Sequence, residues 1–413
     1  MRKQRLWLSS LVITSCMAHA ELTPVPDSVL ADVTGQAYIS IDKTYHPEAA
    51  TANSGKNFSY TRINLGMDIK TLTNIDRLEL GRYSREGDER EGMADILANN
   101  MAFGYIYDEA YYLANPSAPQ PIKGYDTNGN ILKYSDGEIV PFEITNPYLE
   151  FAYDETNGQI VGVRLGMGEA KGIMSGAFQT LTGNLGVNVI DKGEGLNFEH
   201  MATDYCQGDQ CGVLQNGLGM INEQFRNGAQ LTARAVLLNA NGERDSIRAQ
   251  YLGVPNGEAL YLENVDSAIV TALQVMGGFG LKNTFEAVDN GVNIINQDCQ
   301  VIGVASCLPL ENYQSISIGQ ITGTDGERYL TDKAGGMFIS FSGIGDDANE
   351  AGRLEWLNDI NKENPTVDDF MKVTSGFFMN IPDSNAQMNL HDMVNGTDRV
   401  RTEYINMPAR QLF

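Results

Sequence analysis

The chain has 413 residues, and its 53 acidic and 29 basic side chains give a formal net charge of −24 at pH 7. A surface with this charge repels phosphate backbones and anionic membranes, which argues against nucleic acid as a partner. After residue 20, no apolar run approaches the ~20 residues that a transmembrane helix needs, so we expect no helical transmembrane segment.

The first twenty residues have the three parts of a secretory signal peptide. Residues 2–5 carry three positive charges, residues 6–18 are mostly apolar, and residues 18–20 read Ala-His-Ala, an A-x-A cleavage site. The sequence therefore predicts a signal peptide over residues 1–20, export through the inner membrane, and a mature chain that begins at Glu21. Removal of the three positive charges moves the net charge from −24 to −27.

Residues 13–16 leave a second export route open. They read Ile-Thr-Ser-Cys and resemble a lipobox, in which Cys16 would be lipidated and would become the first mature residue. Cleavage before Glu21 is favoured because Ile and Thr are allowed but are not the preferred lipobox residues. A lipoprotein would also keep the A-x-A site uncut next to its lipid.

Alternation of apolar and polar residues is the main structural signal in the mature chain. Residues 60–69 place Thr, Ile, Leu, Met and Ile on one face of a strand, and Tyr, Arg, Asn, Gly and Asp on the other. In residues 161–167, apolar side chains alternate with glycines and an arginine. We expect each such run to be a strand that buries its apolar face. The other runs are residues 231–237, 247–251 and 338–344.

Asn-Gly pairs, a strong hairpin signal, begin at residues 128, 157, 216, 227, 241, 256, 290 and 395. A type I′ turn needs positive φ at both central positions, which Asn tolerates and Gly adopts freely. These pairs and the alternating runs predict an all-β fold of antiparallel strands, extended or sandwich-like, with few short helices. Residues 27–33 and 349–362 are helical candidates, and residues 264–276 fit either a helix or a buried strand.

The length exceeds that of one ordinary β-sandwich. We therefore expect an N-terminal β region over residues 21–200 and a C-terminal β region over residues 201–413. They would form either two domains that meet near residues 193–217 or one extended strand-rich body.

Four cysteines remain once the signal peptide is removed, and their spacing predicts two local disulfides. Cys206 would pair with Cys211, and Cys299 with Cys307, although four cysteines allow three connectivities. His200 precedes the first pair and raises a zinc site as an alternative. An oxidising compartment and the lack of a fourth ligand argue against it.

The sequence assigns no catalytic residue, and we expect a protein that is not an enzyme. The mature chain has three histidines and neither a G-x-S-x-G nor an H-E-x-x-H motif. Pairs of carboxylates are too numerous in so acidic a chain to indicate a glycosidase.

The sequence also raises calcium as a cofactor. Asp126, Asn128 and Asn130 match the start of an EF-hand loop, but no glutamate follows at the twelfth position. An ordinary Asn-Gly hairpin is the favoured interpretation of residues 126–130, so no metal site is assigned.

Residues 21–42 are the most distinctive stretch of the chain. They begin ELTPVPD and continue from residue 30 as LADVTGQAYISID, which resembles the mature N-terminus of the Fil-type pilus or fibre-system proteins of Gram-negative bacteria. Residues 75–83, 145–153 and 166–176 look similar to that family as well, so the resemblance covers about the first half of the chain. It implies a cell-surface, fimbrial or outer-membrane-associated location and a structural or adhesive role, with no catalytic residues.

A fibre subunit needs a strand edge that can pair with a neighbouring subunit through backbone hydrogen bonds. The partners implied by the resemblance are other subunits of the fibre system or further copies of this chain. The early, alternating segment that we expect to supply such a strand is Tyr38, Ile39, Ser40, Ile41 and Asp42.

Two other classes of protein stay open. The terminal aromatic residue Phe413 is typical of outer-membrane β-barrels, although Pro408 and Gln411 interrupt the alternation before it. A secreted calcium-binding or carbohydrate-binding protein is the other alternative. The sequence does not distinguish a shaft subunit from a tip adhesin or an assembly factor.

Overall fold

A computed structural model describes residues 38–45, 58–85, 90, 92–115, 118–192, 223–225, 227–277, 284–301, 304–323, 328–344, 353–362, 364–382 and 386–403. Apart from Tyr38, the described residues belong to one compact unit, Ile39–Phe413. The expected signal peptide, the helical candidate at residues 27–33, the Cys206–Cys211 pair with His200, and the terminal residue Phe413 lie outside the described residues.

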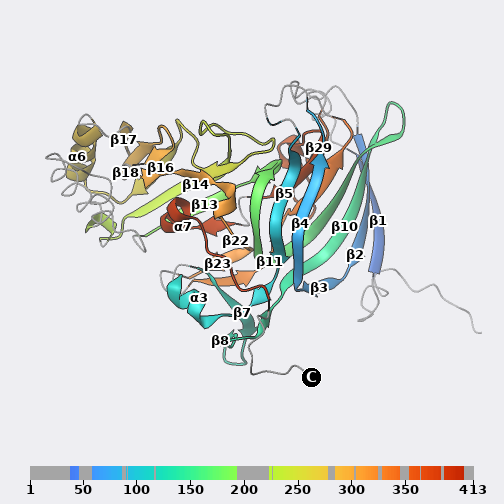
Figure 1. The fold of residues 1–413 in the computed structure, drawn as a ribbon, viewed down its shortest axis with the longest axis horizontal. Coiled ribbons are helices and arrows are strands. Elements are labelled where there is room, and N and C mark those ends of the chain that lie inside the picture. The colour runs from blue at the N-terminus through green and yellow to red at the C-terminus, as the bar shows by residue number, and fades with distance from the viewer. Residues whose placement is uncertain are drawn as a thin grey trace, which may run out of the picture. The chain divides into compact units, whose positions relative to one another are not determined.

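The fold is all-β, as predicted, and its largest sheet has twelve strands within the described residues. Most neighbours along its main path pair antiparallel, whereas the last pair, β12 with β29, is parallel. The path follows, in spatial order, β1 (Tyr38–Tyr45), β2 (Phe58–Gly66), β10 (Phe142–Asp154), β11 (Gln159–Leu181), β26 (Phe338–Ser342), β29 (Gly376–Ile381) and β12 (Gly183–Leu185) (Figure 1).

Strand β11 has 23 residues and belongs to two layers of strands. Its first half pairs with β10 and β26, and its second half pairs with β5 and β22. The strands that join the main path from the side are β3 (Asp68–Thr71), β4 (Thr73–Arg82), β5 (Ala94–Phe103), β22 (Ser315–Ile318) and β25 (Ala334–Gly335).

A second sheet has eight strands in the described part of the chain. Its main path is β17 (Thr284–Val288), β18 (Gly291–Ile295), β16 (Ala259–Glu263), β14 (Gln230–Leu238), β13 (Val187–Asp191) and β30 (Gln387–Met388), and β15 (Tyr251–Gly253) and β21 (Cys307–Pro309) join it from the side.

Smaller sheets and short helices complete the described fold. The small sheets contain β23 (Gln320–Thr322), β24 (Tyr329–Asp332), β7 (Gln120–Tyr125) and β8 (Ile131–Lys133); β6 (Tyr105–Ile106) and β9 (Ile139–Val140); β19 (Gln300–Val301) and β20 (Val304–Ala305); and β27 (Glu355–Leu357) and β28 (Phe370–Lys372). The helices are α3 (Glu109–Ala114), α6 (Ser267–Gly277), α7 (Leu390–Asn395) and the 3₁₀ turns η1 (Leu310–Asn312) and η3 (Val367–Asp369).

Strands from both sides of residue 200 share sheets and cores. β26 and β29 extend the sheet of β10 and β11, and β13 pairs with β14. The largest apolar cluster joins side chains of both large sheets, such as Phe178 and Leu231. A second cluster packs Tyr60, Phe338 and Trp356 beneath the β27–β28 hairpin. The division expected at residue 200 therefore does not coincide with a boundary between sheets.

Most of the predicted elements are present, but two have a different structure. Helix α6 (Ser267–Gly277) covers most of the ambiguous run 264–276, and the runs at 161–167, 231–237 and 338–344 lie in or largely within strands. The predicted strand at 247–251 is wrong, because only Tyr251 belongs to a strand and Arg248 has a φ of 48° that breaks extended structure. The helix at 349–362 is also wrong: Leu354 and Trp356, two residues apart, are both buried where β27 pairs with β28.

Within the described residues, Asn-Gly pairs lie at turns and at the end of α7, and the loop between β10 and β11 is not a type I′ turn. Residues 155–158 connect β10 to β11, and Gly158 alone in this loop has positive φ, at 69°. The Gly158 N–H donates to the Asp154 carbonyl over 2.7 Å, and the Asp154 side chain accepts from Thr156 N–H. A four-residue loop thus replaces the expected two-residue turn, because the aspartate side chain satisfies an otherwise free backbone N–H.

Candidate functional site

The sidedness of the main sheet is the reverse of what the alternation predicts. In β11, Leu165 is 62% exposed, whereas Arg164 is only 1% exposed. Pairing extends this pattern across the sheet, because Arg164 lies opposite Glu150 on β10, which in turn lies opposite Arg62 on β2. The expectation that the apolar face is buried is therefore wrong at Leu165 of β11, and Arg164 and Glu150 lie on the buried face instead.

Glycines explain how a polar face can be packed inside the fold. A Cβ atom added to Gly166 would overlap the ring of Tyr148, and one added to Gly162 would overlap Leu354. Because glycine has no side chain, large groups of the opposing layer approach the strand backbone directly. The glycine face of β11 is therefore the packed face, and its apolar neighbours point outward.

Arg164 is the centre of this buried face. Its Nε donates to the Glu150 carboxylate, its Nη1 donates to the Leu357 carbonyl over 2.7 Å, and its guanidinium lies 4.9 Å from the ring centroid of Trp356 and 5.1 Å from that of Tyr148. Burial raises the pKa of the Tyr148 hydroxyl. A buried ion pair of this kind depends on both members, since removal of one leaves a charge without compensation in a region of low polarity.

The outward face of the same strands is apolar and accessible. Ile39 and Ile41 on β1 are 61% and 67% exposed, and Phe341 on β26 is 45% exposed. Leu165 lies opposite Leu149, and Leu149 lies opposite Ile63, so half-buried apolar side chains continue from the exposed Leu165 across neighbouring strands. We define the apolar face as Ile39, Ile41, Ile63, Leu65, Leu149, Phe151, Val163, Leu165 and Phe341.

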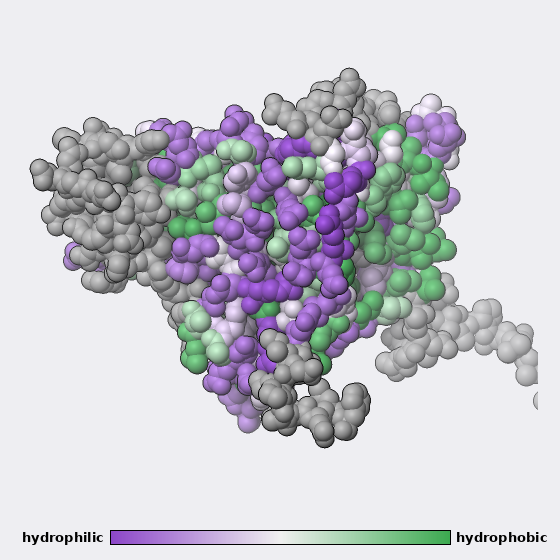
Figure 2. Space-filling model, viewed as in Figure 1, coloured by the Kyte–Doolittle hydropathy of each residue, from purple (hydrophilic) through white to green (hydrophobic). Residues whose placement is uncertain are grey.

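Figure 2 shows hydrophobic residues gathered on the side of the molecule where β1, β2 and β10 lie in Figure 1. A contiguous exposed apolar surface in a soluble protein marks a site of interaction with another molecule, whereas single exposed apolar residues need no such explanation. The apolar face is the strongest candidate for a functional site in the described structure.

The residues expected to supply an assembly strand lie at the rim of this face. Among the described strands, β1 pairs only with β2, so no described strand covers its other edge. The Asn64 side chain donates to Ser40 Oγ over 3.1 Å and also contacts the Asp42 carboxylate. These contacts turn Ser40 and Asp42 toward the polar face, and they leave Ile39 and Ile41 on the apolar face. The side chain of Tyr38 lies outside the description.

One predicted disulfide falls within the described residues. Cys299 and Cys307 are joined, with their Cα atoms 5.2 Å apart, and the bond connects the segment after β18 to β21. The Cys299 N–H also donates to the Asn256 side chain over 2.9 Å. This bond closes a short loop and therefore stiffens an edge of the second sheet rather than forming part of the apolar face.

The residues considered for calcium form a turn that is closed by hydrogen bonds among themselves. Asp126 Oδ1 accepts from the backbone N–H groups of Asn128 and Asn130, each over 2.8 Å, and Oδ2 accepts from the Asn130 side chain. These hydrogen bonds, led by that from the Asn130 side chain, lower the pKa of the Asp126 carboxyl. Asn239 makes the same backbone contacts with Asn241 and Glu243, without a carboxylate. The turn therefore has a structural explanation, and the described residues include no group of three or more His, Cys, Asp or Glu placed to hold a metal.

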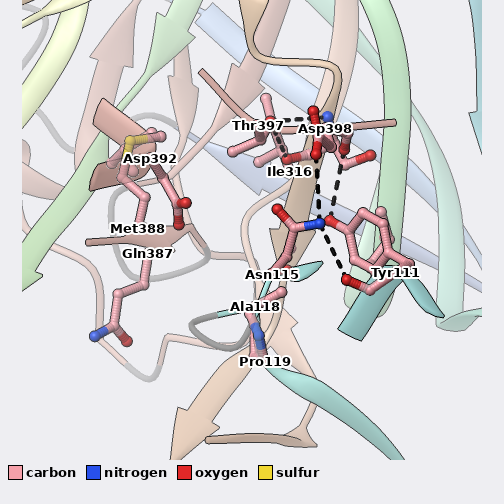
Figure 3. A pocket seen from close by; sticks show the side chains of 14 residues that line it. Tyr111, Asn115, Ala118, Pro119, Ile316, Gln387, Met388, Asp392, Thr397 and Asp398 are labelled. Carbon is pink, nitrogen blue, oxygen red and sulfur yellow. Dashed lines mark hydrogen bonds between the residues drawn. The ribbon is translucent and has the colours of Figure 1, made fainter. Parts of the chain in front are cut away.

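The hollows of the described surface are less suited to a ligand. The one shown in Figure 3 encloses about 30 Å³, room for little more than a water molecule. Its Asn115 side chain already donates to the Tyr111 carbonyl over 3.0 Å and contacts Asp398. A larger hollow of about 390 Å³ is bordered by Arg82, but that side chain is paired with Glu79.

No protein-family model matches this chain, and no curated protein or solved structure shows significant similarity to it. Within the residues described, no helix is both long and apolar enough to cross a bilayer. The role of the apolar face has to be inferred from its own geometry and chemistry.

Sequence reasoning missed two buried charge networks. The first joins Arg62, Glu150 and Arg164, and the placement of Arg164 between two glycines of a strand is a signal that could have revealed it. In the second, Asp95 accepts from the Nε atoms of Arg85 and Arg248 over 3.1 and 3.2 Å. No local pattern marks this network, because its members come together only through tertiary contacts.

Proposed function

We propose that this chain is an exported component of a cell-surface fibre or pilus system, with a structural or adhesive role and no catalytic activity. The observation that carries the proposal is the apolar face together with the open edge of β1. A subunit that assembles with neighbours needs both features: an apolar surface to bury and a strand that can extend a neighbouring sheet.

The open edge favours a protein neighbour over lipid. An edge strand carries a row of backbone N–H and C=O groups without partners, and each such group costs several kcal/mol in a hydrocarbon environment. A bilayer would cover Ile39 and Ile41 but would leave the β1 backbone beside them unsatisfied. Another strand satisfies this backbone and can cover the apolar side chains at the same time.

The test is to locate the protein on intact cells. Cells are sheared, the released material is pelleted, and the chain is sought by mass spectrometry and immunogold microscopy. We expect label along filaments. Label confined to outer-membrane vesicles would contradict the proposal and would favour a membrane-embedded role.

Two variants test whether the apolar face is needed for the protein to be retained in filaments. Leu165→Asp adds a charge to the face, and Gln179→Asp adds the same charge at an exposed position of the same strand outside it. We expect the first variant to be exported but lost from filaments and the second to be retained. Equal retention of both would show that the face does not mediate assembly.

A further inference from the structure

We propose that the open edge of β1 pairs with the same edge of a second copy, antiparallel and centred on Ser40. This inference rests on the proposed function, because it names the first partner of the same surface. The two sheets would become continuous, and the apolar faces of both copies would form one surface.

Symmetry limits how two β1 edges can pair. In an antiparallel ladder, residues directly opposite each other project their side chains to the same side. The two apolar faces therefore join on one side only if a residue of β1 lies opposite its own equivalent at the centre of the ladder. This arrangement has a two-fold axis perpendicular to the sheet and closes after two copies.

The charged residues of β1 limit which residue can lie at the centre of the ladder. A ladder centred on Asp42 or on Lys43 would place two like charges opposite each other, which destabilises a strand pair. A ladder centred on Ile41 would place Ile39 opposite the partner's Lys43. Centring on Ser40 avoids these conflicts, since the hydroxyl faces its own equivalent and no charge meets a like charge.

The Ser40 register also matches the apolar side chains. Ile39 lies opposite the partner's Ile41, and Ile41 lies opposite the partner's Ile39, so four isoleucines meet in the middle of the joined face. Both side chains are more than half exposed in the single chain. Burial of these side chains against one another removes apolar surface from water and therefore favours the joined state.

The charge of the protein does not prevent this contact. Two chains of net charge −24 repel each other, but at 0.15 M ionic strength charges more than ~8 Å apart are largely screened. The only charged residue of β1 on the side of the apolar face is Lys43, beyond Ile41, and Asp42 at the rim is held by Asn64 and lies 3.5 Å from the Arg62 guanidinium. Pairing should therefore strengthen as salt is added, whereas attachment to a basic partner would weaken.

A cysteine placed at the centre of the ladder tests the register. Opposed Cα atoms in an antiparallel pair are about 4.5–5.5 Å apart, which suits a disulfide. Ser40→Cys should therefore give a covalent dimer on mild oxidation of the purified, exported protein. In Asp42→Cys the two cysteines would be offset by four residues, about 13 Å along the ladder, and should not react. The unmodified chain is the control for its native cysteines.

The possible outcomes separate this inference from the proposed function. A covalent dimer of Ser40→Cys without one of Asp42→Cys supports the Ser40 register, and the reverse result overturns it. If neither variant crosslinks and the protein sediments as a monomer, a second copy is not the partner, even where label on filaments upholds the fibre role. A monomer that floats with phosphatidylethanolamine–phosphatidylglycerol vesicles would likewise overturn pairing and would identify lipid as the occupant. A covalent dimer without filament label would support pairing while removing the fibre role.

Discussion

β1 and β4 are two edge strands of the main sheet, and their exposed sides carry different kinds of side chain. On β4, the outward side carries Arg77, Glu79 and Arg82, which form a chain of ion pairs, and the apolar side packs against the core. On β1, the outward side carries Ile39 and Ile41, followed by Lys43. Charged side chains on an edge discourage pairing with other molecules.

β4 therefore carries charges that oppose pairing, whereas β1 presents exposed apolar side chains beside its edge. β4 has the pattern of an ordinary half-buried strand, with Leu78 and Leu80 directed to the core. β1 and its neighbours direct their polar side chains inward and their apolar side chains outward. An apolar edge beside an apolar face is costly in water, so its presence is best explained by a partner that covers both.

A Leu→Asp substitution should reduce stability most at a buried position of β14 and little at an exposed position of β11. Leu231→Asp places a charge at a position of β14 that is 1% exposed, and we expect a loss of more than ~4 kcal/mol in the free energy of unfolding. Leu165→Asp, at an exposed position, should change the stability of the single chain by less than about 0.5 kcal/mol. Urea unfolding measures both. Similar losses in the two variants would contradict the reversed sidedness of β11.

Removing a buried charge should have the next largest effect. Glu150→Ala leaves Arg164 without its carboxylate partner inside the fold, and we expect a loss of about 3–5 kcal/mol in urea unfolding. Glu79→Ala removes the central carboxylate of the exposed β4 ion pairs and should cost far less, because exposed ion pairs contribute little to stability. Comparable small losses in both would mean that the polar face of the sheet is accessible to water.

A smaller loss of stability is expected when a methyl group is added on the glycine face of β11. Gly166→Ala forces the Tyr148 ring to move, and we expect a loss of about 1–3 kcal/mol in urea unfolding. Gly343→Ala is the control, since no atom lies closer than 3.8 Å to its added Cβ. If Gly166→Ala were as stable as Gly343→Ala, close approach would not be the reason for glycine in β11.

The smallest expected change is in stability at low pH, and it comes from the charges on β4. Hydrogen bonds from Arg82 and Arg77 lower the pKa of Glu79 to about 2. Because the folded-state pKa is depressed, the contribution of Glu79 to stability is present above its unfolded-state pKa near 4.5 and is lost as the pH falls toward 2. An NMR titration should give a midpoint near 2 for the Glu79 carboxyl. A midpoint near its ordinary value would show that the ion pairs do not persist in solution.

The sequence predicts the all-β class, the β10–β11 hairpin and the alternating segment at Ile39 and Ile41. Periodicity separates the two faces of a strand, but it does not say which face is buried. That choice depends in part on Trp356, which lies far along the chain from Arg164 and stacks on its guanidinium. The same limit explains residues 349–362, where a helix-like spacing of leucines gives way to a strand once Leu354 and Trp356 pack beneath β11.

The most direct test of the central claim is sedimentation velocity of the exported protein with one charge added to either edge. Ile41→Lys gives β1 the kind of protection that β4 already has, and Asp76→Lys changes a charge on β4. We predict that the unmodified chain and Asp76→Lys form dimers as concentration rises, and that Ile41→Lys stays monomeric over the same range. Equal association of all three proteins would contradict the claim that the β1 edge is the assembly surface.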